Sequence, residues 1–358
     1  MKRIRHDYIV ILLCILIAVC STACSHELPA LQNIAEGQST TPESIEIVIS
    51  HSQALDTPED IAARAMQNKL QELLGEAADV ILYADYQLGS AEEQLEALQL
   101  GRVHITIQSV SHVSKYADDL KVLTLPYLFP QDTQAVIELL DGAMGQEVLD
   151  RVDMECGEPA FKGLGLWFGG YKLFTFHGEQ YKHIQSPADF RGLHIAVPDA
   201  SLVEAQYRHW GAEPVPADSI ALYSILAQQI ADGSEATFAQ IATNYLHEVQ
   251  HNIVQAYHSA EVYAVLANAK WFSALPDDVQ QAVIDAEAYG RKMMYRALAE
   301  KEPVYREQIC QTEGMRFEVL DEKEIQIFKA ATRPIYIEQL AGSPWQIDYV
   351  TRVQKCFT

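Results

Sequence analysis

Alternating strand and helix signals between residues 186 and 238 constrain the fold more than any other part of the sequence. Residues 186–189 (Ser-Pro-Ala-Asp) are typical of a helix start, with a hydroxyl cap, a proline at the first helical position and an acid three residues after the cap. Downstream, the pattern predicts a strand at 194–197, a helix at 201–210, an extended segment at 213–216 and a helix from Ser219. The stretch therefore predicts an α/β unit.

The same alternation precedes this stretch. Strands are expected at 45–49, 79–84 and 103–108, with helices at 57–74 and 90–101 between them, which predicts a largely parallel sheet. The first helix is expected to bury Ile61, Ala65, Leu70 and Leu73.

A second lobe is expected to follow the first sheet. Strands predicted at 163–167 and 171–175 lead into it, and a strand at 262–267 returns to the first lobe. A helix from 277 to about 309 would be about 45 Å long at 1.5 Å per residue. Because that length exceeds one lobe, we expect this helix to run along both. The expected lobes are 44–169 with 262–300, and 170–261 with 301–345.

The N-terminus carries an export signal. Lys2, Arg3 and Arg5 precede an apolar run at 8–19 that is too short to span a bilayer comfortably. Ser21-Thr22-Ala23-Cys24 then resembles a lipobox, whose cysteine is lipidated, although ordinary signal-peptidase cleavage at the small residues is the alternative. Residues 1–24 are thus interpreted as a signal peptide and 25–43 as a polar linker. Both routes place the protein in the periplasmic or extracytoplasmic space, and lipidation would attach it to the membrane.

Charge and cysteine content limit the partners. The formal net charge is −23, and it becomes −25 without the leader, which loses three cations and one anion. So acidic a chain argues against nucleic acid and anionic lipid as partners, and an anionic ligand would need a local cation. Cys156, Cys310 and Cys356 follow Cys24. They allow one disulfide, for which Cys310 with Cys356 is the preferred pair, or three unpaired thiols.

Four motifs in the central stretch resemble a known family. They are Asp-x-x-Gly-Leu-x-Ile-x-Val-Pro at 189–198, Gly-Ala-x-Pro-Val-Pro at 211–216, Leu-Tyr at 222–223 and Asp-Gly-x-Glu at 232–235. In this order they are similar to the extracytoplasmic solute-binding proteins of tripartite ATP-independent periplasmic (TRAP) transporters. The resemblance implies a two-lobe periplasmic-binding-protein-like α/β fold. It also implies a small-molecule ligand, delivery to the membrane permease subunits of the transporter, and neither cofactor nor catalysis.

The resemblance also implies ligand contacts, and the sequence departs from them. Ala196 stands where the family usually has an arginine that pairs with a ligand carboxylate. Lys172 matches a second cationic position. Ser219 stands where an aromatic residue is frequent, and Ala236 where asparagine often follows the Asp-Gly-x-Glu motif. Loss of the arginine favours a weakly anionic or neutral ligand with an apolar portion.

Other candidate contacts come from their positions in the predicted sheet. Ser50, His51, Gln108, Ser109 and His112 lie at or after the carboxyl ends of strands, where open α/β sheets bind ligands. Aromatic side chains are expected near the cleft, namely Tyr127, Trp167, Tyr171, Phe174 and Phe238. The predicted ligand-binding set is Ser50, His51, Gln108, Ser109, Trp167, Tyr171, Lys172, Ala196, Ser219, Ala236 and Phe238.

Two alternative functions remain open. His247, Glu248 and His251 form the HExxH pattern of zinc peptidases, in which two histidines one helical turn apart bind zinc. The extended form of that pattern would need glycine and histidine where this chain has Val254 and Tyr257. The other alternative is a sensor protein that presents its ligand from the same fold.

Overall fold

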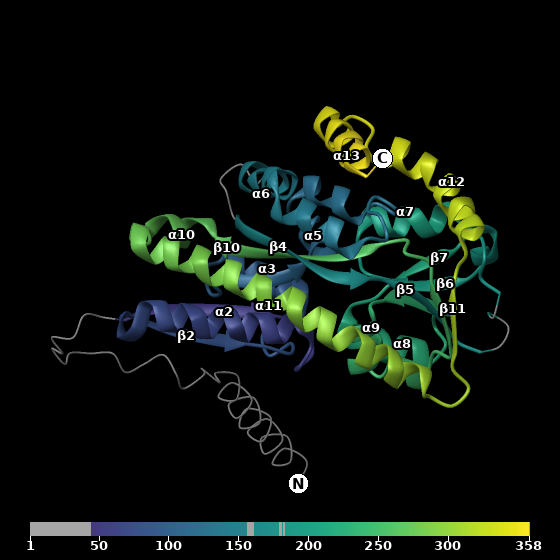
Figure 1. The fold of residues 1–358 in the computed structure, drawn as a ribbon, viewed down its shortest axis with the longest axis horizontal. Coiled ribbons are helices and arrows are strands. Elements are labelled where there is room, and N and C mark those ends of the chain that lie inside the picture. Colours follow the sequence, from purple (N-terminus) through teal and green to yellow (C-terminus); the bar gives the residue numbers. More distant parts are fainter. Residues whose placement is uncertain (1–43, 156–160, 179–180, 182, 358) are drawn as a thin grey trace, which may run out of the picture. The chain divides into compact units, whose positions relative to one another are not determined.

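Two β-sheets covered by helices make up the described chain (Figure 1). The computed structural model describes residues 44–357 apart from 156–160, 179–180 and 182, so the predicted signal peptide, Cys24 and the linker lie outside the described residues. Both sheets belong to one compact unit, Ser44–Thr358. We refer to the part built on the five-stranded sheet as the first lobe and to the part built on the six-stranded sheet as the second lobe.

The sheet of the first lobe has the strand order β2-β1-β3-β10-β4. Its strands are β1 (Ile45–His51), β2 (Ala78–Tyr83), β3 (Ile105–Ser109), β4 (Phe161–Tyr171) and β10 (Ala260–Asn268). β1 pairs in parallel with β2 and β3, as the sequence predicts. The expectation of a largely parallel sheet is wrong for β10, which is antiparallel to both of its neighbours. β10 returns from the second lobe and therefore enters the sheet in the opposite direction.

The sheet of the second lobe has the order β11-β9-β5-β8-β6-β7. Its strands are β5 (Leu173–Phe176), β6 (His194–Val197), β7 (Glu213–Pro216), β8 (Gly233–Ala236), β9 (Asn252–Gln255) and β11 (Arg316–Val319). β6 is parallel to β7 and β8, whereas β5 is antiparallel to β8 and β9. The proline-rich β7 forms the edge, where a missing N–H costs no ladder bond.

Helices cover both sheets. Those of the first lobe are α2 (Pro58–Leu74), α3 (Ala91–Gln99), α4 (Val110–Val113), α5 (Thr133–Asp141), α6 (Ala143–Glu155), α10 (Ala269–Ala274) and the 3₁₀ segment η2 (Asp118–Thr124). The second lobe contains α7 (Ser201–His209), α8 (Ser219–Ala227), α9 (Phe238–Thr243) and the 3₁₀ segments η4 (Pro187–Phe190) and η5 (Leu246–Glu248). The start at Ser186 has the predicted reciprocal capping by Asp189, but it opens only η4.

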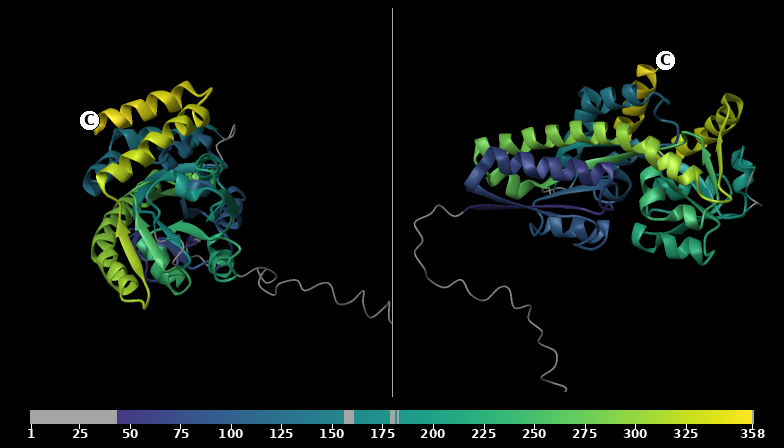
Figure 2. Two further views of the ribbon diagram at one scale, coloured as in Figure 1. Left: turned by 90° about the vertical axis from the view of Figure 1, so that its right-hand side faces the viewer. Right: turned by 60° about the horizontal axis from the view of Figure 1, so that its bottom comes forward.

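The long helix α11 (Asp277–Cys310) contacts α2 in the first lobe and α9 in the second, as predicted (Figure 2). A Cβ at Gly290 of α11 would lie 2.9 Å from Met66 Cβ and 3.1 Å from the Ala62 carbonyl oxygen. The two helices therefore approach closely over small side chains. This contact turns the face of α2 with Ala62, Ala63 and Met66 inward, so the predicted inward position of Leu73 is wrong and that residue is 43% exposed.

Two of the segments in which the chain crosses between the lobes are adjacent. Lys172 alone separates β4 from β5, and residues 256–259 join β9 to β10. The Lys172 amide donates to the Ser259 carbonyl over 2.9 Å, so the two crossings lie side by side. A paired crossing of this kind lets two lobes change their angle with few backbone rotations.

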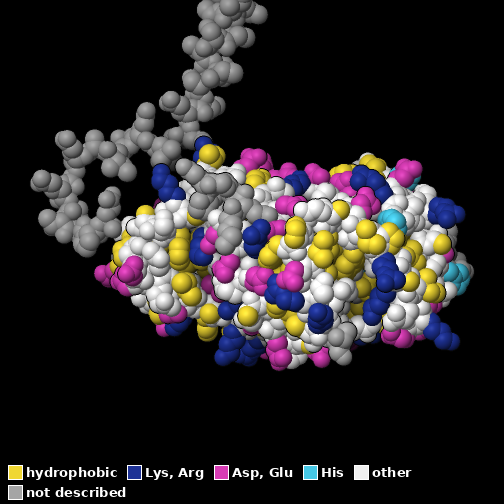
Figure 3. All heavy atoms as spheres, turned by 90° about the horizontal axis from the view of Figure 1, so that it is seen from above, with side chains coloured by type: hydrophobic (Ala, Val, Ile, Leu, Met, Phe, Trp, Pro, Cys, Tyr) yellow, Lys and Arg dark blue, Asp and Glu magenta, His cyan; other side chains and the backbone are white. Residues whose placement is uncertain are grey.

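The C-terminal part holds one element that the sequence reading omitted. After α12 (Glu322–Gln339), α13 (Pro344–Cys356) packs on the first lobe, where Gln346 Nε2 donates to Asp119 Oδ1 over 2.9 Å. Seen from above, the molecule mixes acidic, basic and apolar side chains (Figure 3). Cys310 and Cys356 are free and exposed, so the expected disulfide is wrong, and Cys156 lies outside the described residues. No helix among the described residues is long and apolar enough to cross a membrane.

Candidate functional site

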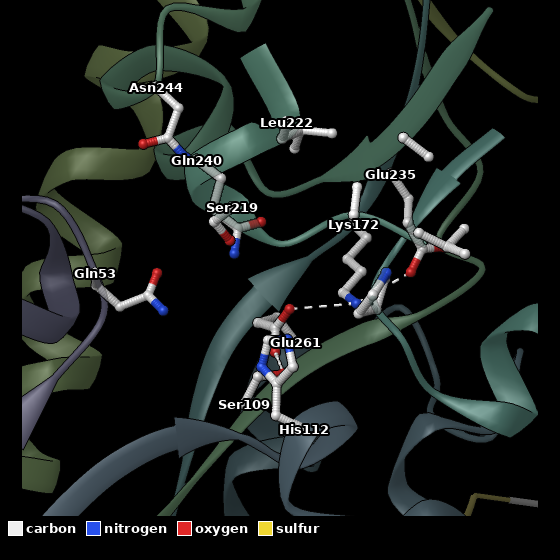
Figure 4. A pocket seen from close by; sticks show the side chains of 14 residues that line it. Gln53, Ser109, His112, Lys172, Ser219, Leu222, Glu235, Gln240, Asn244 and Glu261 are labelled. Atoms are coloured by element: carbon white, nitrogen blue, oxygen red, sulfur yellow. Dashed lines mark hydrogen bonds and ion pairs between the residues drawn. The ribbon is translucent and has the colours of Figure 1, made fainter. Parts of the chain in front are cut away.

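A polar cavity that is open on one side lies where the two sheets meet. Its walls come from strand ends and from the first turns of helices, as expected for an α/β fold. Polar and charged walls are Gln53, Ser109, His112, Lys172, Ser219, Glu235, Gln240, Asn244 and Glu261, and apolar walls are Ala196, Val197, Pro198, Ala217 and Leu222 (Figure 4).

A buried ion cluster forms one side of this cavity. Lys172 Nζ donates to Glu235 Oε1 on β8 over 3.0 Å and lies 3.3 Å from Glu261 Oε2 on β10. Lys172 thus joins a carboxylate of the second lobe to a carboxylate of the first. Glu235 Oε2 also accepts from the Tyr207 hydroxyl over 2.7 Å and from His258 Nε2 over 3.1 Å. These contacts between side chains hold the charges in place.

The cluster fixes its protonation states. Burial alone would lower the pKa of Lys172, but the two carboxylates outweigh it and raise that pKa above its ordinary value. Burial would likewise raise the pKa of Glu235, but Lys172 and the hydrogen bonds from His258 and Tyr207 hold it well below its ordinary value. Burial lowers the pKa of His258 despite the adjacent carboxylate. At neutral pH Lys172 is therefore an ammonium and Glu235 a carboxylate.

The first-lobe end of the cavity gathers Ser109, His112 and Glu261 (Figure 4). Ser109 Oγ donates to Glu261 Oε1 over 2.5 Å. Burial, with Lys172 and Lys115 nearby, lowers the pKa of His112 to about 4, so its imidazole is neutral at pH 7. His112 Nδ1 is buried and has no hydrogen-bond partner among the described residues. A buried polar atom of this kind calls for a partner that the protein itself does not supply, such as a bound water, an ion or a ligand.

Four of the eleven predicted ligand-binding residues are brought together in the cavity wall, namely Ser109, Lys172, Ala196 and Ser219. Ala196 is buried on β6, so its methyl group lines the cavity where the resemblance implied a guanidinium. Leu222 and Val197 add apolar surface beside it. The wall at this position is therefore apolar.

The other seven lie outside the cavity wall. Ser50, His51 and Gln108 are buried and hydrogen-bond to Thr106, Asp60 and Ser52, respectively. Among the aromatic candidates, Trp167 donates to Glu287 across the first-lobe core, and the Tyr171 hydroxyl donates to the Pro130 carbonyl. Ala236 is buried, and Phe238 packs on Phe317. Tyr127 and Phe174 also lie outside, so the wall contains none of the expected aromatic residues.

Sequence reasoning missed Glu261, Gln53, Gln240 and Asn244. Glu261 had a usable signal, because it is a charged residue at the second position of the otherwise apolar strand β10. Gln240 carries the reciprocal cap of α9, which hides any second role. No local sequence pattern distinguishes Gln53 or Asn244 as a ligand contact.

The HExxH pattern does not form the helix that zinc binding needs. Residues 246–248 make the single 3₁₀ turn η5, and the chain enters β9 at Asn252, directly after His251. His247 Nδ1 lies 3.1 Å from the Ile241 carbonyl oxygen. No group of three or more metal-ligating side chains is found among the described residues. The geometry therefore gives the zinc-peptidase alternative no support.

Two lobes, two adjacent crossings and a polar cavity between the sheets define a two-lobe binding protein. The family model for bacterial extracellular solute-binding proteins of family 7 (DctP) matches residues 49–342. This chain belongs to that family, which confirms the resemblance to TRAP solute-binding proteins. It is thus an extracytoplasmic solute-binding protein of the TRAP type, and the family binds substrates rather than transforming them.

Individual relatives agree with this assignment. The chain is 29% identical over 247 residues to the C4-dicarboxylate-binding periplasmic protein DctP of Rhodobacter capsulatus, covering 69% of this chain and 72% of that one. It is 25% identical over 303 residues to the C4-dicarboxylate-binding protein DctB of Bacillus subtilis, covering 84% of each. A TRAP periplasmic solute-binding protein of Shewanella oneidensis with bound succinate shares the fold, with a TM-score of 0.81, 24% identity and coverage of 88% and 100%.

Proposed function

We propose that this protein captures a small organic solute in the cavity between its sheets and delivers it to the permease of a TRAP transporter. The observation that carries this proposal is the cavity itself, because both lobes wall it and Lys172, at the crossing, joins them. Closure of the lobes (44–169 with 262–300, and 170–261 with 301–345) about the paired crossing would enclose the solute.

The ligand contacts that we propose are the polar groups of the wall. Sequence patterns had pointed to Ser109, His112, Lys172 and Ser219, and Asn244 joins them at the cavity. Ala196 supplies shape rather than charge. Ser50, His51, Gln108, Trp167, Tyr171, Ala236 and Phe238 would support the walls from behind. Relatives named for C4-dicarboxylates make an organic acid the natural comparison, but an acid could not be held here by an arginine at position 196.

The N-terminal segment would keep the protein beside its permease. We propose export by residues 1–24 and lipid attachment at Cys24, with 25–43 as a tether. In cells fed a radiolabelled fatty acid, the full chain should incorporate label and Cys24→Ala should not. Labelling of both forms, or of neither, would contradict lipidation at this residue.

Solute capture is tested by identifying what the exported protein retains. The purified protein should release a small organic molecule on denaturation, and the refolded protein should bind that compound with 1:1 stoichiometry in a calorimeter. Ser219→Phe should abolish this binding, because a bulky side chain at the first residue of α8 fills the cavity. Ser224→Phe on the exposed side of the same helix is the matched control and should bind normally. Retention of no molecule, or equal binding by both variants, would contradict the proposal.

A further inference from the structure

The cavity wall carries an unbalanced negative charge. Among its described residues the charged groups are Lys172, Glu235 and Glu261, and all three are buried. The single ammonium contacts both carboxylates, so one negative charge has no cation of its own. A buried charge without a partner is costly, and a cation that enters the cavity would remove that cost.

A pocket that adjoins the cavity is acidic as well. An adjoining pocket shares His112 and Ala217 with the cavity, and its walls carry Glu92, Asp199 and Asp218. Lys115 contacts Glu92 and Asp199, which leaves this group negative too. These carboxylates attract cations and repel anions near the cavity.

The first-lobe end of the cavity also offers acceptors. Glu261 has two partners, the Ser109 hydroxyl and the Lys172 ammonium, and a carboxylate can accept about four hydrogen bonds. His112 Nδ1 is buried without a partner beside it. These groups lie together in Figure 4. A protonated nitrogen with several N–H groups matches this end of the cavity, and a carboxylate does not.

We propose that the solute taken by this cavity carries a protonated nitrogen that binds Glu261, and that it has no net negative charge. The inference rests on the proposed solute capture and names its ligand class. Diamines and zwitterionic amino compounds belong to this class, whereas dicarboxylates do not. The remaining wall, with Ser219, Gln240 and Asn244, offers neutral hydrogen bonds to the other end of the molecule.

Matched probes of similar length test the charge. We would measure binding of 1,4-diaminobutane, 4-aminobutyrate, 1,4-butanediol and succinate to the purified exported protein by calorimetry. The two compounds with a protonated nitrogen should bind at least about tenfold more tightly than succinate. Glu261→Gln should remove most of that difference, because it deletes the unbalanced charge. Glu46→Gln, at an exposed position of β1, is the control and should leave the order unchanged.

The possible outcomes separate the two proposals. If succinate or the neutral diol binds as tightly as the nitrogen compounds, or if the molecule released from the purified protein is a net anion, the charge inference fails while solute capture stands. If no molecule is released and none of the probes binds, solute capture fails and this inference fails with it. If Glu261→Gln does not fold, the charge inference is decided by the net charge of the molecule that the wild-type protein releases.

Discussion

Two lysines in this protein each lie between two carboxylates, but in opposite surroundings. Lys172 joins Glu235 and Glu261 inside the molecule, where the three side chains are 6%, 1% and 4% exposed. Lys115 joins Glu92 and Asp199 at the surface beside the cavity, where the side chains are 30%, 49% and 63% exposed. Both trios carry the same net charge and both connect the first lobe to the second.

The difference between the trios lies in what replaces a lost partner. Water solvates an exposed carboxylate when its lysine is removed, so such pairs contribute at most about 1 kcal/mol. The side chains of the buried trio are almost fully shielded from solvent, so removal of one partner leaves an uncompensated charge. The same net charge should therefore stabilise the two trios unequally, and the buried trio should discriminate more strongly by the charge of a ligand.

The largest expected effect comes from Lys172→Met. This change leaves two buried carboxylates without their cation and should lower the free energy of unfolding by about 3–5 kcal/mol. Chemical denaturation at neutral pH measures it. If Lys172→Met alone does not fold, the variant that also carries Glu235→Gln and Glu261→Gln should recover part of the stability. A loss below about 1 kcal/mol would show that water reaches the buried trio.

A second test uses Glu59, a buried carboxylate without a lysine. Its Oε1 has no hydrogen-bond partner among the described residues, and burial raises its pKa to about 7. Because the folded-state pKa lies above the ordinary value of 4.5, this group's contribution is fully present below pH 4.5 and is lost as the pH rises through 7. Glu59→Gln should flatten that decline by roughly 3 kcal/mol, measured as unfolding free energy between pH 4.5 and 8.

The pH dependence of stability that Glu235 contributes should have the opposite sign. Its folded-state pKa is lowered, so its contribution to stability is present above the unfolded-state pKa and is lost as the pH falls through the folded-state pKa.

The control for the Glu59 test is Glu46→Gln, which removes an exposed carboxylate and should follow the wild-type curve at all pH values. Parallel curves for Glu59→Gln and the wild type would mean that Glu59 is solvated.

A third test weakens the buried trio without removing a charge. Ser109→Ala deletes the hydroxyl that donates to Glu261 and should cost about 2 kcal/mol of unfolding free energy, since hydrogen bonds to charged groups are the stronger ones. Ser114→Ala removes a bond to the neutral Ser111 carbonyl and should cost about 1 kcal/mol or less. Equal losses of unfolding free energy in the two variants would indicate that the charge of Glu261 does not strengthen its hydrogen bond from Ser109.

The sequence predicted the elements whose signals are local. The strand at 194–197, the helix from Ser201 and the helix from Asp277 are formed as predicted, because capping residues, prolines and hydrophobic period act within a few residues. The start of α13 carries the same signals, since Ser343 caps it and Pro344 occupies its first turn, so this helix is also predictable from local sequence.

Features set by partners distant in sequence were not predictable in this way. The inward face of α2 depends on Gly290 of α11, a contact that no pattern within α2 contains. The buried trio joins residues 172, 235 and 261, and only the first two had been singled out, through the family resemblance. The expected aromatic wall was wrong because aromatic side chains such as Trp167 and Phe174 complete the cores of their own lobes instead.

The smallest effect is expected at the exposed trio. Lys115→Met removes contacts to Glu92 and Asp199 that water and salt can replace, so the unfolding free energy should change by less than about 1 kcal/mol. The change should disappear in 1 M NaCl, where the Debye length is about 3 Å. Thermal melting of wild type and Lys115→Met in 50 mM and 1 M NaCl measures both statements. A loss as large as that of Lys172→Met, or one that salt leaves unchanged, would remove burial as the reason why the two trios differ.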